Sequence, residues 1–542
     1  MSLRISALCL LILLLAGATR AAPTYTWGHG YGDSDTQNLW SVATDPTGNV
    51  LICGSFYSTI TIKSTLTSAG MQDAFIAKLD SDGNALWNHR VGVGTFDDIA
   101  WDVTSDKDGN VIAVGAMSPT VGNRIPVGIV KYAPDGTQLW IKTFGANQTN
   151  DAGQFVATDL AGNIIVAGHY QDTIDFGGGS LSPPFLSSQA MFLVKFDPNG
   201  NHIWSETLGD DYAATAGMEA DATGNVVLFG QFQHTIDFGL GALTSAGLND
   251  LFLVKFASDG RALWNHRFGN AGLDPPACLA LAPDGRAAIA ENLDGAVDFG
   301  GGPLTPTGSP QPAVAVYAPD GSYMWSKTFT ATTYAFGYGM TFAENNDLVL
   351  ACNGSGSIDF GGGPVAASGV FYNVFVARLS ASNGAHRWSF SFAGDDNVYG
   401  FPAIAHGQLI VAGYMDGAAD PGGGPLPYGG ATDVFVAGYD ETLTGAGAPR
   451  LTAVLDQNIP NPFNPTTSIP YTLARSMRVV IGIYDVSGAR VARLDQGVQS
   501  PGAHAATWNG RDGSGRAVAS GVYFYRMEGS AGTPQRKMML LK

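Results

Sequence analysis

Short apolar runs recur along most of this chain, and turn residues separate them. Trp40 to Thr44 (WSVAT) is one such run, the turn DPTGN follows, and Val50 to Phe56 (VLICGSF) is the next run. A glycine-containing loop leads to Asp73 to Leu79 (DAFIAKL), and the turn DSDGN leads to Ala85 to Val91. Short runs of this kind between turn signals are typical of strands in antiparallel hairpins. The pattern predicts a unit of four strands.

The fourth strand of this unit carries a tryptophan, and this strand recurs along the chain. Its most similar copies are ALWNHRVG at 85–92 and ALWNHRFG at 262–269. Tryptophans occupy the same place, at spacings of 53 to 64 residues, at Trp87, Trp140, Trp204, Trp264, Trp325 and Trp388. A single four-stranded sheet cannot bury both of its faces, but neighbouring sheets can bury each other's. The repeat therefore predicts the blades of a β-propeller.

The number of blades follows from a unit that is incomplete. Six tryptophan strands end six units, and a seventh unit begins at Asp395 but has no tryptophan strand. Trp27, in YTWGHG, lies 60 residues before Trp87 and therefore occupies the missing register. We expect the N-terminal strand to complete the last sheet, because this removes an exposed edge. The prediction is a seven-bladed β-propeller over residues 23–443, closed by the N-terminal strand.

The repeated units resemble the SBBP-type β-propeller repeat of bacterial extracellular proteins. The resemblance rests on the DxxGN turn, as at Asp45, Asp159 and Asp221, and on IDFGGG at 174–179 and 358–363. The second unit departs from it, because VGNRIPVG replaces the DFGGG loop. This resemblance implies a fold and no shared activity.

The repeated units end before a predicted linker at 444–451, and a different sequence pattern follows it. Residues 452–542 contain about seven strand-length runs with turn signals between them, which is typical of a small β-sandwich. The fold class predicted for the whole chain is thus all-β, a propeller followed by a small sandwich.

This C-terminal segment closely resembles the type A C-terminal sorting domain of the type IX secretion system, which is similar to the immunoglobulin-like domain of flagellar hook-capping proteins. The residues that carry the resemblance include Pro460, Asn461, Pro462, Phe463, Asn464, Pro465, Gly521, Tyr523, Lys537 and Lys542. The resemblance implies that outer-membrane secretion machinery is a partner. The protein would then be released, or fixed on the outer surface of a Gram-negative cell.

The N-terminus has the features of a signal peptide over residues 1–22. Arg4 precedes an apolar stretch from Ile5 to Ala18, and small residues follow at Ala21 and Ala22. No other segment approaches 18 apolar residues, so we expect no transmembrane segment in the mature chain. The predicted location is secreted or on the outer cell surface.

Charge and cysteine usage narrow the classes of partner. The formal net charge is −18 and no run is rich in lysine or arginine, so nucleic acid is not an expected partner. After removal of the signal, Cys53, Cys278 and Cys352 remain, without metal-site spacing. We interpret them as buried small hydrophobic residues. His89 and His266, on tryptophan strands, are expected to be solvated at the outer edge.

Acidic residues mark the loops that lead from one unit to the next. They are Asp33, Asp35, Asp97, Asp98, Asp151, Asp210, Asp211, Asp274, Asp395 and Asp396. These loops are expected on the propeller face that carries the mouth of the central channel. One hypothesis is an acidic rim that binds calcium or a cationic group. The alternative is that the aspartates cap loop amides or keep the surface soluble.

The sequence contains no recognisable catalytic motif, and we nominate no catalytic residue. The first hypothesis is a non-enzymatic surface or secreted protein whose propeller binds a glycan, a peptide or another extracellular protein. The second is an extracellular propeller enzyme, a metal-assisted lyase or hydrolase, with its site at the channel. Histidine and aspartate converging on the channel would favour it, whereas an apolar and amide lining would count against it. The third hypothesis is that the chain is a quinone-type or assembly scaffold.

Overall fold

The structure is a computed structural model of the 542-residue chain. It describes residues 22–93, 96–118, 126–145, 151–183, 189–209, 212–308, 310–367, 371–441, 453–455, 457–473, 477–486, 489–499, 502–527 and 536–541. All of the regular secondary structure in these ranges is β-strand. The predicted signal peptide and the predicted linker lie almost wholly outside the described residues.

Seven antiparallel sheets follow one another over residues 24–440 of the described chain. Sheet 1 contains β2 (Gln37–Thr44), β3 (Val50–Thr61), β4 (Thr65–Leu79) and β5 (Ala85–Val91). Sheet 2 contains β6 (Ile99–Ser105), β7 (Val111–Ala116), β8 (Val127–Tyr132) and β9 (Gln138–Phe144). Sheet 3 contains β10 (Ala152–Thr158), β11 (Ile164–Gln171), β14 (Gln189–Phe196) and β15 (His202–Leu208).

The remaining four sheets repeat this order. Sheet 4 contains β16 (Ala214–Ala220), β17 (Val226–Phe232), β20 (Asp250–Phe256) and β21 (Ala262–Phe268). Sheet 5 contains β22 (Pro276–Leu281), β23 (Ala287–Leu293), β26 (Gln311–Tyr317) and β27 (Tyr323–Thr328). Sheet 6 contains β29 (Ala335–Phe342), β30 (Leu348–Gly354), β33 (Asn373–Leu379) and β34 (His386–Gly394), with β37 (Ala419–Asp420) at its edge. Sheet 7 contains β35 (Val398–Ala405), β36 (Gln408–Met415), β38 (Asp433–Asp440) and β1 (Thr24–Tyr31).

The DFGGG loops form small hairpins between the second and third strands of a sheet. Asp175 Oδ1 accepts hydrogen bonds from the amides of Gly177 and Gly179, and the other copies repeat this turn. The short strands are β12 (Ile174–Asp175), β13 (Ser180–Leu181), β18 (Thr235–Ile236), β19 (Leu243–Thr244), β24 (Val297–Asp298), β25 (Pro303–Leu304), β31 (Ser357–Asp359) and β32 (Pro364–Ala366). The short strand β28 (Thr330–Ala331), which precedes β29, pairs with β31. The motif thus has a structural role as a turn.

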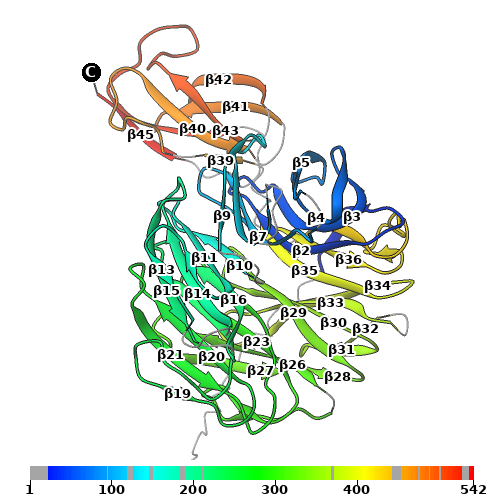
Figure 1. The fold of residues 1–542 in the computed structure, drawn as a ribbon. Helices are drawn as coiled ribbons and strands as arrows, with labels where there is room; N and C mark the ends of the chain where they lie inside the picture. Colours follow the sequence, from blue (N-terminus) through cyan, green and yellow to red (C-terminus); the bar gives the residue numbers. More distant parts are fainter. Residues whose placement is uncertain are drawn as a thin grey trace, which may run out of the picture.

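The arrangement of the sheets is propeller-like. The first strands contact each other in the order β2, β6, β10, β16, β22, β29 and β35, and β35 contacts β2. These first strands therefore lie inside, and Figure 1 shows the sheets arranged around a common centre. The second and third strands, such as β3 and β4, are buried on both faces by neighbouring sheets, which explains their continuous apolar runs.

The N-terminal strand β1 is the fourth strand of sheet 7. It runs antiparallel to β38, with Trp27 opposite Gly438 and Gly30 opposite Phe435. The indole nitrogen of Trp27 donates a hydrogen bond to the carbonyl of Ser81 in sheet 1 at 3.1 Å. The two ends of this domain, far apart in the sequence, therefore pair within one sheet.

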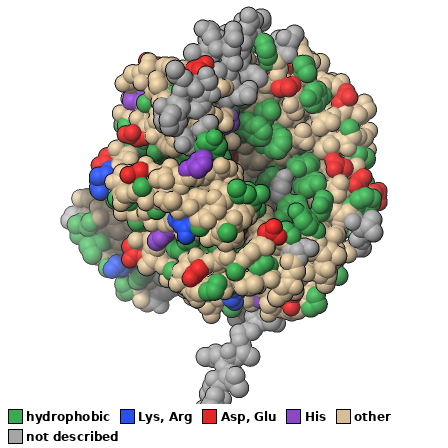
Figure 2. All heavy atoms as spheres, turned by 60° about the horizontal axis from the view of Figure 1, so that its bottom comes forward, with side chains coloured by type: hydrophobic (Ala, Val, Ile, Leu, Met, Phe, Trp, Pro, Cys, Tyr) green, Lys and Arg blue, Asp and Glu red, His purple; other side chains and the backbone are tan. Residues whose placement is uncertain are grey.

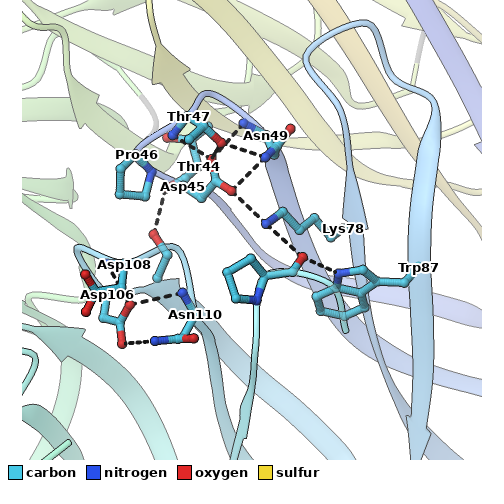
Figure 3. Close-up of polar contacts among 12 residues, drawn as sticks. Thr44, Asp45, Pro46, Thr47, Asn49, Lys78, Trp87, Asp106, Asp108 and Asn110 are labelled. Atoms are coloured by element: carbon cyan, nitrogen blue, oxygen red, sulfur yellow. Dashed lines mark hydrogen bonds and ion pairs between the residues drawn. The ribbon is translucent and has the colours of Figure 1, made fainter. Parts of the chain in front are cut away.

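A buried polar contact, which we call the clasp, joins sheet 1 to sheet 2. Lys78 Nζ lies 2.8 Å from Asp45 Oδ2, and the two side chains are only 3% and 1% exposed. The lysine also donates to the carbonyl of Pro134, in the β8–β9 turn, at 3.3 Å. Trp87 donates to the same carbonyl at 3.1 Å. Figure 3 shows this chain of contacts, which satisfies every member in the interior.

The clasp recurs, and sheet 5 shows what replaces it. Sheets 2 and 3 repeat it in full, through the ion pairs Lys131–Asp106 and Lys195–Asp159. In sheet 5, Val316 stands opposite Trp325 in the lysine register, and Ala282 begins the turn in the aspartate register. Both ionic partners are absent together, and two apolar residues of the core stand in their places.

The prediction that His89 and His266 are solvated is wrong. Both side chains are partly buried against the next sheet. His89 Nε2 lies 2.7 Å from the carbonyl oxygen of Gly136, and its ring stacks on Tyr132 at 4.6 Å. His266 makes the matching contacts with Gly321 and Tyr317. The fourth strands are covered here because the turn of the next sheet folds over them.

The C-terminal region forms a two-sheet domain. One sheet contains β39 (Ala453–Leu455), β40 (Thr467–Leu473) and β43 (Gly502–Trp508). The other contains β42 (Arg490–Gln499), β41 (Met477–Tyr484), β44 (Gly521–Met527) and β45 (Arg536–Leu540). One hydrophobic cluster, with Trp508 and Tyr525 among its most buried members, lies between them. The strand pattern of a small sandwich is thus present.

Candidate functional site

The predicted acidic residues lie in the loops between sheets, but their exposure differs widely. Asp35 and Asp395 are exposed, whereas Asp98 and Asp274 are each only 1% exposed. Asp33, Asp97 and Asp396 are partly exposed to solvent. Asp210 and Asp211 lie outside the described residues. The described members therefore do not form one uniformly exposed rim.

The buried members meet acids from the third strands instead. Around Gly92, Asp73 of sheet 1 and Asp98 of the following loop converge, since a Cβ placed on this glycine would lie 2.4 Å from Asp73 Oδ1 and 2.9 Å from Asp98 Oδ2. Neither of these two oxygens has a hydrogen-bond partner in the described structure. Burial, followed by the charge of Asp73, raises the pKa of Asp98 to about 7.

A second such junction, between sheets 4 and 5, has three acids. Asp250 and Asp274 converge around Gly269, and Glu291 of β23 points toward both. Glu291 is 1% exposed, and burial together with the charge of Asp274 raises its pKa to about 9. Arg267 forms an ion pair with Asp250. With both aspartates ionised and one guanidinium beside them, protonation of Glu291 reduces the excess of negative charge in the cluster from two to one.

We expect the substitution Glu291→Gln to stabilise the chain in alkaline solution, by about 1–2 kcal/mol at pH 8. The folded-state pKa of Glu291 lies above its unfolded value, so its contribution to stability is full at low pH and is lost as pH rises toward 9. Glutamine removes this loss. Thermal unfolding of variant and parent at pH 5 and pH 8 measures this difference in stability. The control is Glu206→Gln, because Glu206 is exposed on β15. Identical pH profiles for the variant and the parent would contradict the expectation.

Calcium remains an untested prediction. In the part of the chain that the structure describes, no group of three or more His, Cys, Asp or Glu side chains has the geometry to hold a metal ion. The described acids instead bond loop amides, as Asp33 does with Asp35 and Thr59, or pair locally at the junctions.

The central cavity lies on the axis of the propeller-like domain. It has a volume of about 510 Å³, and first strands of all seven sheets line it. Its aromatic lining comprises Trp40, Trp101, Phe155, Phe336 and Phe401. Figure 2 shows one face of the molecule hollowed near its middle, with hydrophobic side chains around the hollow. A volume of this size is typical of sites for small molecules.

Two carboxyl groups face this cavity. Asp102 of β6 accepts hydrogen bonds from Ser41 Oγ at 2.7 Å and from the amide of Val156 at 2.8 Å, and so joins three inner strands. Enclosure by protein raises its pKa to about 6. Glu219 of β16 is open to the cavity, and desolvation followed by the charge of Asp102 raises its pKa to about 8. No histidine belongs to the lining.

Aromatic side chains continue from the cavity onto the face that carries the loops between sheets. We call this group the aromatic arc; it comprises Trp101, Trp40, Tyr414, Tyr399, Tyr372, Phe336 and Tyr334. Neighbouring ring centroids lie 4.7 to 6.4 Å apart. The rings are partly exposed, and Tyr334 is 45% exposed. The arc spans sheets 2, 1, 7 and 6.

The residues that carry the resemblance to a sorting domain divide into buried and exposed sets. Phe463 is 2% exposed and packs on Trp508, and Tyr523 packs on the same indole. The amide of Phe463 donates to the carbonyl of Met539, and Asn461 accepts from the amide of Met539. This segment therefore lies against β45. Pro460, Pro462, Asn464, Pro465 and Lys537 are exposed, Gly521 begins β44, and Lys542 lies outside the described residues.

The structure thus defines an all-β protein with a propeller-like domain and an immunoglobulin-like C-terminal domain. The FlgD Ig-like domain family matches residues 464–533. An uncharacterized WD repeat-containing protein of Acanthamoeba polyphaga mimivirus is 22% identical over 315 residues, 44% of this chain. The matched part spans only 22% of that relative's length.

Three solved structures are similar to this chain at low sequence identity. A Bacteroides caccae protein of unknown function has a TM-score of 0.30 at 12% identity, covering 52% of this chain and 78% of its own. A chain of the mitotic checkpoint complex has a TM-score of 0.38 at 9% identity, and the match covers 80% of this chain and 98% of that one. Quinohemoprotein alcohol dehydrogenase from Comamonas testosteroni has a TM-score of 0.25 at 11% identity, and the match covers 73% of this chain and 59% of that one. Among the described residues there is no helix of membrane-spanning length and hydropathy.

Proposed function

We propose that this chain is an exported, non-enzymatic recognition protein that binds an extracellular glycan on the aromatic arc. The arc carries the proposal because its rings are partly exposed, adjoin one another and border the central cavity. Sugar rings present flat C–H faces that stack on aromatic rings, and aromatic side chains provide a large contact area at low entropic cost.

A glycan array on the full chain tests this proposal. We expect Tyr334→Ala combined with Tyr399→Ala to weaken binding by about tenfold or more, since this corresponds to about 1.4 kcal/mol. Tyr212→Ala is the matched control, because Tyr212 is 46% exposed in an interblade loop outside the arc. Absence of any glycan ligand, or equal loss in the control, would overturn the proposal. A protein ligand on the arc would be the alternative outcome.

The finer architecture that we propose is a seven-bladed β-propeller of SBBP-type repeats, closed by the N-terminal strand. The pairing of β1 with β38 and the contact of β35 with β2 support it. Closure places the arc and the cavity at one continuous mouth.

We further propose that a signal peptide and the C-terminal domain address the protein to the outer surface of a Gram-negative cell through the type IX secretion machinery. The exposed prolines and asparagine beside β45 support this, because they are available to a partner while Phe463 anchors them. Cell fractionation with and without residues 452–542 tests it. We expect the truncated chain to stay in the periplasm, and surface display of the truncated chain would contradict the proposal.

One observation favours the alternative of an extracellular lyase or hydrolase. Asp102 and Glu219 face the same cavity, and their pKa values are raised to different levels, to about 6 and about 8. Such a pair can divide the roles of base and acid. Turnover of a polysaccharide that Glu219→Gln abolishes, without loss of binding, would support this alternative.

A further inference from the structure

The central cavity is acidic without any basic counterpart. Its lining includes five aromatic rings, methionines and two carboxyl groups, but no lysine, arginine or histidine. The aromatic faces carry negative electrostatic potential, so they attract cations, and this attraction grows when the cation is desolvated. Both kinds of group in the lining therefore favour positive charge at the centre of the ring of sheets.

The two carboxyl groups differ in whether their oxygens are free to bind a ligand. Asp102 accepts bonds from Ser41, from its neighbour Val103 and from Val156, so its oxygens are occupied by protein. Glu219 has no hydrogen bond or ion pair within the described ranges of the chain. Its side chain is exposed toward the cavity, where the surrounding inner strands still raise the pKa of the carboxyl, so a cation beside it favours the charged form. Glu219 is thus the available anionic group.

We propose that the central cavity binds an organic cation, an ammonium group on an apolar body, with Glu219 as its counter-ion. Trp40 and Trp101, whose ring centroids lie 4.8 Å apart, line the same cavity and contact the apolar body or the N-methyl groups. An organic cation fits this lining better than a metal ion, which would need several more oxygen ligands. The cavity shares Trp40, Trp101 and Phe336 with the aromatic arc, so the two proposals are separated by variants outside this overlap: Glu219 for the cation, and Tyr334 with Tyr399 for the glycan.

Protonation provides a signature of this site. At pH 7 the raised pKa of Glu219, about 8, keeps its carboxyl mostly protonated, whereas a bound cation favours the charged form. Binding therefore releases a proton, and affinity increases as pH rises from 6 to 9. Asp102 on β6 and Cys278 on β22 are the other titratable groups in the lining. Asp102 is already largely ionised at pH 7, because its pKa is about 6.

Calorimetry and tryptophan fluorescence of the full chain test the proposal. The probes are choline, benzyltrimethylammonium and phenethylammonium, and the uncharged isostere of choline, 3,3-dimethylbutan-1-ol, is the matched control. We expect at least one cation to bind with proton release, and choline to bind about tenfold more tightly than the isostere. Glu219→Gln should abolish this preference and the proton release, whereas Glu206→Gln should preserve both.

The outcomes separate this inference from the other proposals. Failure of all three cations to bind, equal affinity for choline and its isostere, or full preference retained in Glu219→Gln would each overturn it. Glycan binding on the arc is measured with the same variants. Its persistence in Glu219→Gln would show that the two sites act separately, so either proposal can fail alone.

Discussion

Lys78→Val is expected to lower the free energy of unfolding by about 3–5 kcal/mol. The substitution leaves the carboxylate of Asp45 buried, with 1% of its side chain exposed, and without its counter-ion. Hydrogen bonds from Thr47 and Asn49 remain, but they do not neutralise the charge. Urea unfolding at pH 7, followed by tryptophan fluorescence, measures the loss. The control is Lys107→Val, whose partner Asp108 is 65% exposed, and which should leave the free energy of unfolding close to that of the parent.

The double variant Asp45→Ala with Lys78→Val should recover most of this loss, to within about 2 kcal/mol of the parent. The chain itself provides the precedent, because sheet 5 folds with Ala282 and Val316 in these two registers. Removing both charges leaves no uncompensated group, whereas removing one does. A double variant less stable than Lys78→Val alone would show that the clasp contributes through the turn and not through charge compensation.

Much of the fold was predictable because its signals are local. The predicted strand at 85–91 coincides with β5, and the run predicted from Val50 begins where β3 begins. The predicted runs 40–44 and 73–79 end where β2 and β4 end, but these two strands begin earlier. The loop after Phe56 was expected to be irregular, but β3 continues to Thr61 and β4 begins at Thr65, since the two pair as a long hairpin. Hairpin extension depends on pairing across the turn, which apolar periodicity does not record.

The candidate site was not predictable in the same way, because its residues meet only in the folded ring. Asp102 and Glu219 are far apart in the sequence and belong to sheets 2 and 4. One signal was present: a charged residue within a first strand, where the other units have mainly small or apolar residues. The sequence does not show that Asp98 and Asp274 are buried, since the acids that meet them belong to third strands of the preceding sheets: Asp73 lies within β4, and Asp250 begins β20.

Removal of the N-terminal strand should strongly reduce thermal stability and cause the chain to associate. A chain without residues 1–31 lacks β1, so β38 presents unpaired backbone groups from Val434 to Asp440 at an open edge. The contact of Trp27 with the carbonyl of Ser81 in sheet 1 is lost as well. We expect the unfolding midpoint to fall by about 10 °C or more, and dimers or aggregates to form through the exposed edge.

The matched control is a chain without residues 1–22 only, which retains β1 and should remain monomeric. A synthetic peptide of residues 22–33, added to the shorter chain, should restore both the midpoint and the monomer, because it can pair with β38 in the same register. Rescue of this kind depends on sequence, so a peptide with Trp27 changed to alanine should rescue poorly. A stable monomer without β1 would mean that the ring does not need the N-terminal strand, and the proposed closure by this strand would have to be abandoned.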